Sequence, residues 1–198
     1  MKIARRLIAC ALLLALLTLG LCSCVPNGNF VKMHIKTADG EVDGYVYIEL
    51  YPQIAPITVE NFKKLVSRGF YDGLTFHRLA KGFCLQGGDP EGTGMGGSGK
   101  TIKGEFAFNG VHNDLSHTTG VVSMARRGDS YDSATSQFFF VLSDNHTGSL
   151  DYQYAAFGKV VKGWEVVEEC AKVETGYNEK PRVTITIVSA EVVAGVDA

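Results

Sequence analysis

The sequence predicts one mainly β domain, in which short antiparallel strands form a barrel or a sandwich together with two helices. Two observations carry this prediction. Short apolar segments alternate with turn residues through most of the chain, and only two segments repeat apolar residues at helical spacing. A chain of 198 residues that is 45% hydrophobic and 10% aromatic has enough apolar side chains for one core of ordinary size. Disorder over most of the chain is therefore excluded.

The first predicted elements are a β-hairpin and a helix. A strand starts at Phe30, where apolar and polar residues begin to alternate, and the Asp39-Gly40 turn leads to a second strand over residues 42–50. Residues 56–69 then read as a helix, with apolar residues at helical spacing and a final glycine as the stop signal.

The rest of the chain predicts five strands, a second helix and a closing strand. The strand segments are short, apolar and separated by turn residues, which is typical of antiparallel β structure. We place the strands at residues 74–79, 83–86, 120–125, 137–142 and 155–161, the helix at residues 163–173 and the closing strand at residues 183–193.

The N-terminal segment is predicted to be an export signal that does not belong to the fold. Lys2, Arg5 and Arg6 precede an apolar run from Leu7 to Leu21 that no charge interrupts. At about 15 residues this run is shorter than the roughly 20 that a membrane-spanning helix needs, so a retained anchor is the alternative rather than the first interpretation.

The end of this segment resembles the lipobox of bacterial lipoproteins, in which an aliphatic residue and two smaller residues precede the lipidated cysteine. Leu21 to Cys24 has this pattern, whereas Cys22 fits less well because bulky Leu21 would occupy the cleavage position. We therefore predict a signal peptide over residues 1–23, lipidation of Cys24, a tether over residues 24–29, and a location on the outer side of the cytoplasmic membrane, in the periplasm or at the outer membrane. An ordinary signal peptide cut near this point is the alternative.

Charge and cysteine content exclude several classes of protein. Lys and Arg number 19 against 21 Asp and Glu, so the formal charge of −2 argues against nucleic acid as a partner. Loss of the leader and lipidation of Cys24 would leave only Cys84 and Cys170, which excludes a disulfide framework. One bridge between these two cysteines stays open, and their spacing does not suggest a metal site.

A glycine-rich segment contains two patterns that nucleotide-binding proteins use. Residues 92–97 match the dinucleotide pattern, and residues 94–101 match the P-loop pattern. Both patterns hold phosphate only when a buried strand leads into the loop and a helix leaves it. Neither flanks this segment, so we interpret it as a flexible surface loop.

Four motifs point to a known family. They read Phe-His-Arg-Leu-Ala-Lys-Gly-Phe-Cys-Leu-Gln-Gly-Gly-Asp at residues 76–89, His-Thr-Thr-Gly-Val-Val-Ser-Met-Ala at residues 117–125, Ser-Gln-Phe-Phe-Phe at residues 136–140, and Leu-Asp at residues 150–151 with Ala-Phe-Gly-Lys-Val at residues 156–160. In order and spacing they resemble the cyclophilin family of peptidyl-prolyl cis-trans isomerases. The resemblance spans Phe30 to Val193.

The resemblance implies a closed eight-stranded antiparallel barrel capped by two helices, a domain over residues 30–198, and isomerisation of X-Pro bonds in proline-containing polypeptides without cofactor or metal. It places the catalytic arginine at Arg78 and an amide-binding glutamine at Gln86. The residues that would bind substrate are Phe83, Cys84, Ala125, Arg126, Phe139, Leu150 and Tyr154, with Ala125 and Arg126 using backbone groups on an extended peptide.

Some positions depart from the family pattern. Ser149 stands where cyclosporin-sensitive members have Trp, Tyr154 where many have His, and Arg126 where many have Asn. His77 and His117 lie inside the motifs, and we interpret them as hydrogen-bonded structural residues rather than as a catalytic pair.

Two other functions are weighed against the isomerase, which is expected to be a monomer. The first alternative is a non-catalytic module that binds proline-containing peptides on the same barrel. Retention of Arg78 beside Gln86 favours the enzyme, because binding alone would not need a charged donor over the bond. A P-loop nucleotide-binding protein is the more distant alternative.

Overall fold

The fold is one curled antiparallel sheet of eight strands. The computed structural model describes residues 28–196, so the predicted signal peptide, Cys24 and most of the tether lie outside the described residues. The strand order across the sheet is β3-β4-β6-β5-β7-β2-β1-β8, and every neighbouring pair is antiparallel. The strands are β1 (Phe30–Thr37), β2 (Asp43–Leu50), β3 (Arg78–Ala80), β4 (Cys84–Gly87), β5 (Val121–Met124), β6 (Phe138–Val141), β7 (Ala156–Lys162) and β8 (Ile185–Val193).

The predicted eight strands and hairpin are confirmed, but one strand is shifted and the closure is looser than expected. Leu74–Leu79 was predicted as a strand, whereas β3 starts only at Arg78. The residues before it cross to the other edge of the sheet. There the N–H of Phe76 donates to Ile185 (2.9 Å) and the carbonyl of Leu74 accepts from Ile187 (2.8 Å). These bonds, rather than a continuous ladder, join the two edge strands.

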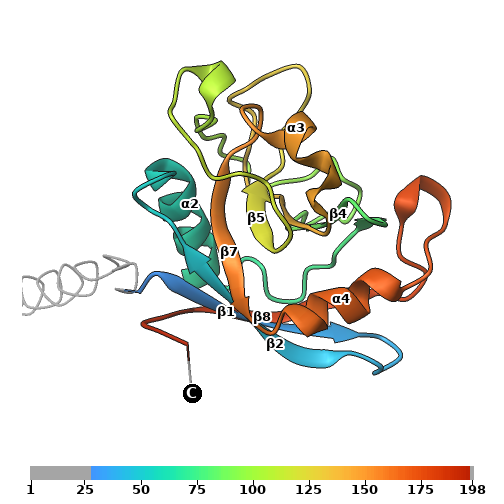
Figure 1. Ribbon diagram of the computed structural model, residues 1–198. Coiled ribbons are helices and arrows are strands. Elements are labelled where there is room, and N and C mark those ends of the chain that lie inside the picture. Colours follow the sequence, from blue (N-terminus) through green and yellow to red (C-terminus); the bar gives the residue numbers. More distant parts are fainter. Residues whose placement is uncertain (1–27, 197–198) are drawn as a thin grey trace, which may run out of the picture.

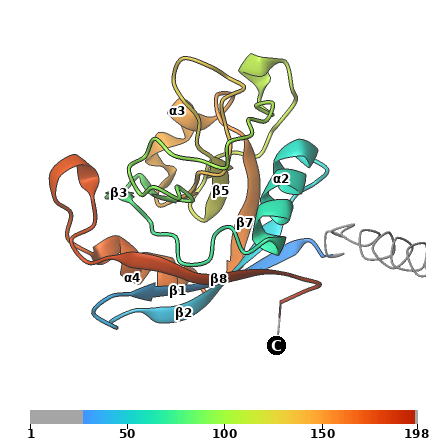
Figure 2. The same ribbon diagram turned by 180° about the vertical axis from the view of Figure 1, so that it is seen from behind.

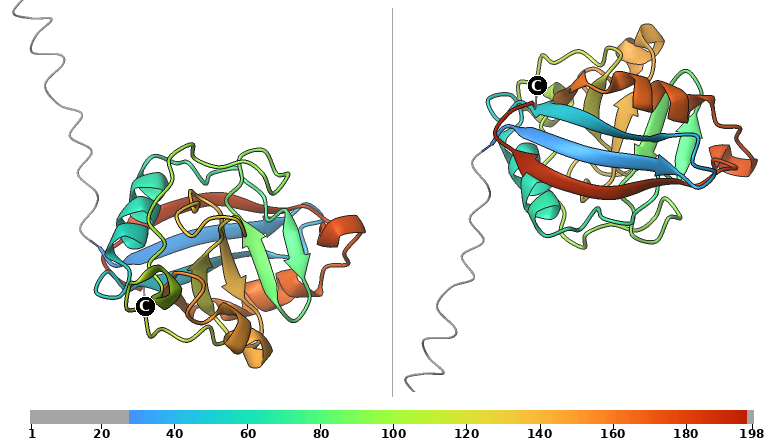
Figure 3. Two further views of the ribbon diagram at one scale, coloured as in Figure 1. Left: turned by 90° about the horizontal axis from the view of Figure 1, so that it is seen from above. Right: turned by 90° about the horizontal axis from the view of Figure 1, so that it is seen from below.

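Irregular pairing bends the sheet. The register shifts by a residue between β1 and β8, between β2 and β7, and between β5 and β7. Such bulges increase the local twist and help a sheet to curl. The strands β1, β2 and β8 lie side by side on one side of the molecule (Figure 3).

Two helices cover the ends of the sheet, as predicted. α2 (Pro56–Ser67) contacts β8 and α4 (Trp164–Lys172) contacts β2, and the two helices lie at opposite ends of the molecule (Figures 1 and 2). The structure adds a short α3 (Thr147–Leu150) and the 3-10 turns η1 (Ala107–Asn109), η2 (Asp144–His146) and η3 (Tyr177–Glu179). No helix within residues 28–196 combines the length and apolar character needed to cross a membrane.

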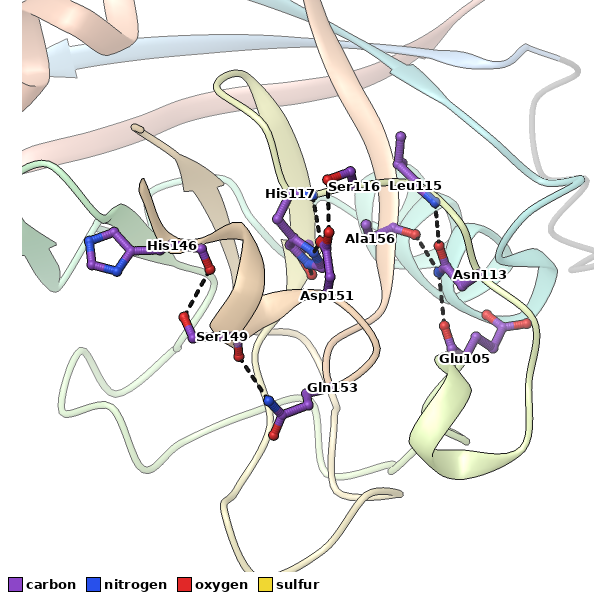
Figure 4. Close-up of polar contacts among 11 residues, drawn as sticks. Glu105, Asn113, Leu115, Ser116, His117, His146, Ser149, Asp151, Gln153 and Ala156 are labelled. Carbon is purple, nitrogen blue, oxygen red and sulfur yellow. Dashed lines mark hydrogen bonds and ion pairs between the residues drawn. The ribbon is translucent and has the colours of Figure 1, made fainter. Parts of the chain in front are cut away.

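The start of α2 is capped by a residue from a distant loop. Glu105 is buried, and its carboxylate accepts hydrogen bonds from the N–H of Ile57 (3.0 Å), the N–H of Thr58 (2.7 Å) and the hydroxyl of Thr58 (2.7 Å). A helix start leaves such N–H groups unpaired and favours negative charge. Asn113 fixes the same loop, because its amide donates to the carbonyls of Glu105 and Ala156 (Figure 4). The cap therefore ties α2 to the sheet.

Alternation along β6 divides its side chains between two apolar clusters. Phe138 and Phe140 point into the main core, whereas Phe139 and Val141 join a smaller cluster on the outer face with Ala80, Cys84, Val121, Leu150 and Ala156. Successive side chains of a strand point to opposite faces, so four consecutive apolar residues serve both. The outer cluster is the base of the site described next.

Candidate functional site

Strand register brings the predicted site residues into one row on the outer face of the sheet. Arg78 on β3 pairs with Gln86 on β4, Gln86 pairs with Phe139 on β6, and Phe139 pairs with Ser123 on β5. Residues that pair directly across antiparallel strands project to the same face. A charged, an amide and an aromatic side chain therefore stand next to one another, although 61 residues separate the first from the last.

All nine site residues named from the sequence line one surface pocket. We call it the Arg78 pocket, and its volume is about 150 Å³. Its lining residues are Arg78, Phe83, Cys84, Gln86, Ala125, Arg126, Phe139, Leu150 and Tyr154. Within the part of the chain that the structure describes, no other residue lines this pocket, so the predicted residues and the lining residues are the same nine.

Arg78 lies at one side of the pocket and is held by several partners. Its Nη1 donates to Gln86 Oε1 (3.2 Å) and makes a weak contact with the sulfur of Cys84 (3.5 Å), and its Nε donates to Glu179 Oε2 (2.7 Å). The guanidinium carbon also lies 5.7 Å from the centre of the Phe83 ring, within the range of a cation–π contact. The side chain is 35% exposed, so its charge is accessible from the pocket mouth.

Gln86 connects Arg78 to the glycine-rich loop. Its Nε2 donates to Gln137 Oε1 (2.9 Å), and Gln137 Nε2 in turn donates to the carbonyls of Gly94 (3.0 Å) and Gly96 (2.8 Å). Each amide has one orientation that satisfies both neighbours. This chain of bonds orients the oxygen of Gln86 toward Arg78.

The glycine-rich loop is anchored, in contrast to the flexible loop expected from the sequence. The carboxylate of Asp89 accepts from the N–H groups of Glu91 (2.8 Å), Thr93 (3.0 Å) and Gly94 (2.6 Å). Burial alone would raise the pKa of Asp89, but these backbone donors together hold it below its usual value. Two amides of the dinucleotide pattern, those of Thr93 and Gly94, are thus already bonded to a carboxylate of the same chain.

The floor of the Arg78 pocket is apolar and buried. Cys84, Phe139 and Leu150 are 2–4% exposed, and the ring of Tyr154 packs edge-on against Phe139 with the centroids 6.0 Å apart. Burial raises the pKa of the Cys84 thiol to about 11, so the thiol is neutral at physiological pH and acts as an apolar wall. Cys84 and Cys170 are both free, so the open question of a bridge between them is answered.

Arg126 forms the opposite rim of the pocket. Its guanidinium carbon lies 4.7 Å from the ring centre of Tyr154 and 5.0 Å from that of Tyr131, and its Nε donates to the carbonyl of Gln153 (3.0 Å). The N–H of Ala125 donates to the carbonyl of Gln137 (2.9 Å), so this N–H is used within the fold. The contacts expected between the backbone of Ala125 and Arg126 and an extended peptide stay a prediction.

A polar network around the buried imidazole of His117 lies against Phe139 of the floor, and Figure 4 shows its bonds to Asp151. His117 Nδ1 lies 2.7 Å from Asp151 Oδ1 and His117 Nε2 lies 2.9 Å from the hydroxyl of Ser123, while the Ser116 hydroxyl donates to Asp151 Oδ2 (2.8 Å). The imidazole stacks on Phe139 with the centroids 6.4 Å apart. Burial lowers the pKa of His117, so the neutral ring donates to Asp151 and accepts from Ser123.

His77 and His117, which both lie inside the motifs, differ in their hydrogen bonding. The interpretation of His117 as a hydrogen-bonded structural residue agrees with this network. For His77 it is wrong, because both ring nitrogens are buried without a hydrogen-bond partner. Burial among apolar atoms lowers the pKa of His77, which keeps the ring neutral. The difference is that Asp151 and Ser123 lie within hydrogen-bond distance of the His117 ring nitrogens, whereas no described protein group does so for the ring nitrogens of His77.

Ser149 lies beside the pocket without lining it. Its hydroxyl donates to the carbonyl of His146 (2.8 Å), and its carbonyl accepts from Gln153 (3.1 Å; Figure 4). The next residue, Leu150, is the one that reaches the pocket. A large side chain at Ser149 would therefore extend the rim.

Two residues of the site were missed by sequence reasoning. Gln137 stood inside a motif, directly before the phenylalanines, and its position there was the available signal. Glu179 is 101 residues from Arg78 in a polar segment without periodicity, and nothing in the sequence marked it. Among residues 28–196, no group of three or more His, Cys, Asp or Glu is arranged to hold a metal ion.

The geometry supports chemistry that uses a fixed charge beside an apolar cavity. Arg78 offers the charged, planar hydrogen-bond donors of a guanidinium. The buried floor excludes water, which strengthens the field of that charge on a bound group. A ligand with a small apolar ring and an adjacent amide would satisfy both parts of the pocket.

Comparisons with known proteins agree on one family. The family model described as cyclophilin type peptidyl-prolyl cis-trans isomerase/CLD matches residues 30–192. Peptidyl-prolyl cis-trans isomerase-like 1 of Neurospora crassa is 43% identical over 151 residues, which cover 76% of this chain and 89% of that protein. Peptidyl-prolyl cis-trans isomerase B of Bacillus subtilis is 48% identical over 120 residues, which cover 61% of this chain and 78% of that protein.

A solved structure is also similar. The crystal structure of a Cryptosporidium parvum cyclophilin type peptidyl-prolyl cis-trans isomerase, determined in the presence of the dipeptide Ala-Pro, aligns with a TM-score of 0.71 and 29% identity. The alignment covers 83% of this chain and 99% of that one. Sequence motifs, fold and overall similarity therefore lead to the same family.

Proposed function

Because the chain belongs to the cyclophilin family and is a peptidyl-prolyl cis-trans isomerase, we propose that it acts on exported proteins while a lipid on Cys24 holds it at a membrane. The leader carries this proposal. Three basic residues, an uninterrupted apolar run and the Leu21 to Cys24 pattern follow one another in the order of a lipoprotein signal. The tether after Cys24 would then place the isomerase domain outside the cytoplasmic membrane.

Lipidation gives this domain a firm attachment that the leader alone would not. Stable anchoring normally requires more than one membrane-binding signal, and a diacylglyceryl group with an N-acyl chain provides more than one acyl chain. Removal of residues 1–23 also removes Lys2, Arg5 and Arg6, so the remaining chain is more acidic than the full one. The exported domain would act as a monomer on unfolded chains that reach it.

We further propose that the Arg78 pocket binds the proline ring and that Arg78 and Gln86 act on the X-Pro bond. The supporting observation is that all nine catalytic and substrate-binding residues predicted from the sequence line one pocket. The guanidinium of Arg78 lies at its edge, and the apolar floor lies below. The relative from Cryptosporidium parvum was studied with Ala-Pro, a ligand of the size and chemistry proposed here.

The proposed chemistry uses charge rather than a covalent step. Rotation about an amide C–N bond has a barrier of about 18–20 kcal/mol, because the nitrogen lone pair is delocalised into the carbonyl. In the twisted transition state that lone pair is localised and accepts a hydrogen bond from Arg78. The apolar floor holds the ring while the other side of the bond turns, and Gln86 keeps the guanidinium oriented.

Membrane fractionation tests the anchor. We expect Cys24→Ala to release the protein from membranes and to abolish its labelling with palmitate. Cys22→Ala is the matched control, because it changes the neighbouring cysteine and leaves the lipobox intact, so this variant stays attached. Continued labelling and membrane association of Cys24→Ala would contradict the lipoprotein assignment.

A further inference from the structure

Glu179 contacts Arg78 on the side opposite to Gln86. The carboxylate oxygen Oε2 accepts from Arg78 Nε at 2.7 Å, while Nη1 donates to Gln86 Oε1 at 3.2 Å. A guanidinium is planar, and partners at two of its nitrogens fix both its position and its plane. Glu179 and Gln86 therefore clamp the group that borders the Arg78 pocket.

The backbone that carries Glu179 is strained. Within η3, Asn178 has φ +54° and Glu179 has φ +58°. This left-handed region is unfavourable for residues with a Cβ, and Glu lacks the local hydrogen bonding that makes Asn more tolerant of it. Strained residues of this kind persist where their surroundings hold them, and they are concentrated at functional sites.

The base of this loop is braced against the hairpin that carries Arg78. The N–H of Gly176 donates to the carbonyl of Lys180 (2.8 Å), and the N–H of Arg182 donates to that of Glu174 (2.7 Å). Lys81, which directly follows β3, donates to the carboxylate of Glu174 (2.9 Å). The loop and β3 are thus joined at two points, through Lys81 and through Arg78.

We propose that Glu179 is a positioning residue for the isomerase reaction. Its carboxylate fixes the plane of the Arg78 guanidinium so that the remaining donors face the X-Pro bond, and it does not touch the substrate. The inference rests on the role proposed above for Arg78. It also gives a reason for the positive φ of Glu179 within η3.

Two effects of Glu179 oppose each other. Its negative charge weakens the electric field of Arg78, whereas its hydrogen bond restricts the motion of the Arg78 guanidinium. Glu179 is 49% exposed, so water screens its charge, and orientation is the larger effect. Glu179→Ala should therefore lower kcat by about fivefold to tenfold and change KM by less than about twofold. Glu179→Gln keeps an acceptor oxygen for Nε and should keep most of the wild-type kcat.

A matched pair of glycine variants separates positioning from loop stability. Glycine adopts positive φ without strain, so Glu179→Gly and Asn178→Gly should both unfold at or above the wild-type temperature. Only Glu179→Gly removes the contact with Arg78. We expect it to lose kcat as Glu179→Ala does, while Asn178→Gly keeps wild-type kinetics. Equal losses in both glycine variants, or none in either, would overturn the inference, and so would a Glu179→Gln variant as slow as Glu179→Ala.

A double-mutant cycle with Arg78→Lys completes the test. Lysine has no planar guanidinium whose Nε–H could be oriented by Glu179. In the Arg78→Lys background, Glu179→Ala should therefore have no further effect on kcat. A full additional loss would show that Glu179 does not act through Arg78 and would overturn the inference. Arg78→Ala, measured alongside, separates the two proposals. Full activity of Arg78→Ala would contradict the role of Arg78 itself. If Arg78→Ala has a low kcat but the separate variant Glu179→Ala has the kcat of the wild type, only the role of Glu179 is contradicted.

Discussion

One wall of the Arg78 pocket is polar and partly exposed, whereas the other is apolar and buried. Arg78 is 35% exposed and is oriented by Gln86 and Glu179, while Phe139 is 4% exposed and packs against Tyr154 and His117. Rotation of an amide bond requires a group that responds to the transition state. Binding of a proline ring requires a cavity that does not change. On the function proposed above, the polar wall serves turnover and the apolar wall serves binding, so variants of each should affect different kinetic constants.

The polar wall should give the largest effect. We predict that Arg78→Ala lowers kcat and kcat/KM together by about 10²-fold or more, which corresponds to roughly 3 kcal/mol of transition-state stabilisation. The protease-coupled assay on a tetrapeptide containing Ala-Pro measures this loss. Arg78→Lys keeps the charge without the planar fork and should recover only part of the activity. Equal activity of the lysine variant and the wild type would show that the fork is not needed.

The apolar wall should give a smaller effect, mainly on binding. Phe139→Ala enlarges the cavity, so we expect KM to rise by about tenfold with a smaller loss of kcat. Phe139 is almost fully buried, so the substitution should also lower the free energy of unfolding by about 3 kcal/mol. Circular dichroism at the assay temperature checks that the variant is folded. A loss confined to kcat would contradict the division between the two walls.

The rim of the apolar wall should control cyclosporin binding. We predict that Ser149→Trp tightens the binding of cyclosporin by about tenfold or more, because an indole adds apolar contact and a hydrogen-bond donor beside Leu150. Calorimetric titration measures the change. Gly148→Trp is the matched control, since it adds the same side chain one residue earlier, and it should leave the affinity near that of the wild type. Equal affinities of Ser149→Trp and the wild type would show that this position does not face the ligand.

The support beneath the apolar wall should give the smallest effect, seen as a dependence of stability on pH. Burial lowers the pKa of His117 in the folded state, so the unfolded state takes up a proton first as the pH falls below about 6.5. The free energy of unfolding should then fall by up to about 1.4 kcal/mol per pH unit. Burial alone would raise the pKa of Asp151, but hydrogen bonds from His117 and Ser116 hold it below its usual value, so the free energy of unfolding should fall further as the pH drops below about 4.

Urea denaturation between pH 7 and pH 5 tests this prediction. The lowered pKa of His77 acts in the same direction, so the comparison of interest is the slope of the wild type against that of His117→Gln. His117→Gln should be less stable overall and less sensitive to pH. His112→Gln, which changes an exposed side chain, should keep the wild-type slope. An unchanged slope in His117→Gln would show that His117 titrates alike in the two states.

The sequence predicted the apolar wall better than the contacts of the polar wall. Residues 137–142 were predicted as a strand from their apolar side chains, and the structure shows that Phe138 to Val141 serve both faces of the sheet, with Phe139 outward. Strand and helix positions followed from the same local patterns. The lining of the pocket followed from family motifs rather than from periodicity.

The parts that were not predicted depend on contacts between distant and irregular segments. Glu179 bonds to Arg78 from a loop 101 residues away, and Glu105 caps α2 from another loop. The carboxylate of Asp89 accepts hydrogen bonds from backbone N–H groups of the glycine-rich loop. Loop conformation is set by such side-chain to backbone bonds, which leave no period in the sequence. Residues 74–79 were predicted as one strand from their apolar side chains. The pairing of residues 74–76 with β8 was not predicted, because this contact is equally non-local.

Exchange NMR with the Arg78→Ala variant tests the central claim, that the polar wall acts on rotation and the apolar wall on binding. A proline peptide mixed with the enzyme gives the rate of cis-trans interconversion on the enzyme and, from a titration, the Kd. We predict that Arg78→Ala slows interconversion by about 10²-fold or more while the Kd changes by less than about threefold. Interconversion at the wild-type rate in folded Arg78→Ala, or a loss explained by weaker binding alone, would contradict the account.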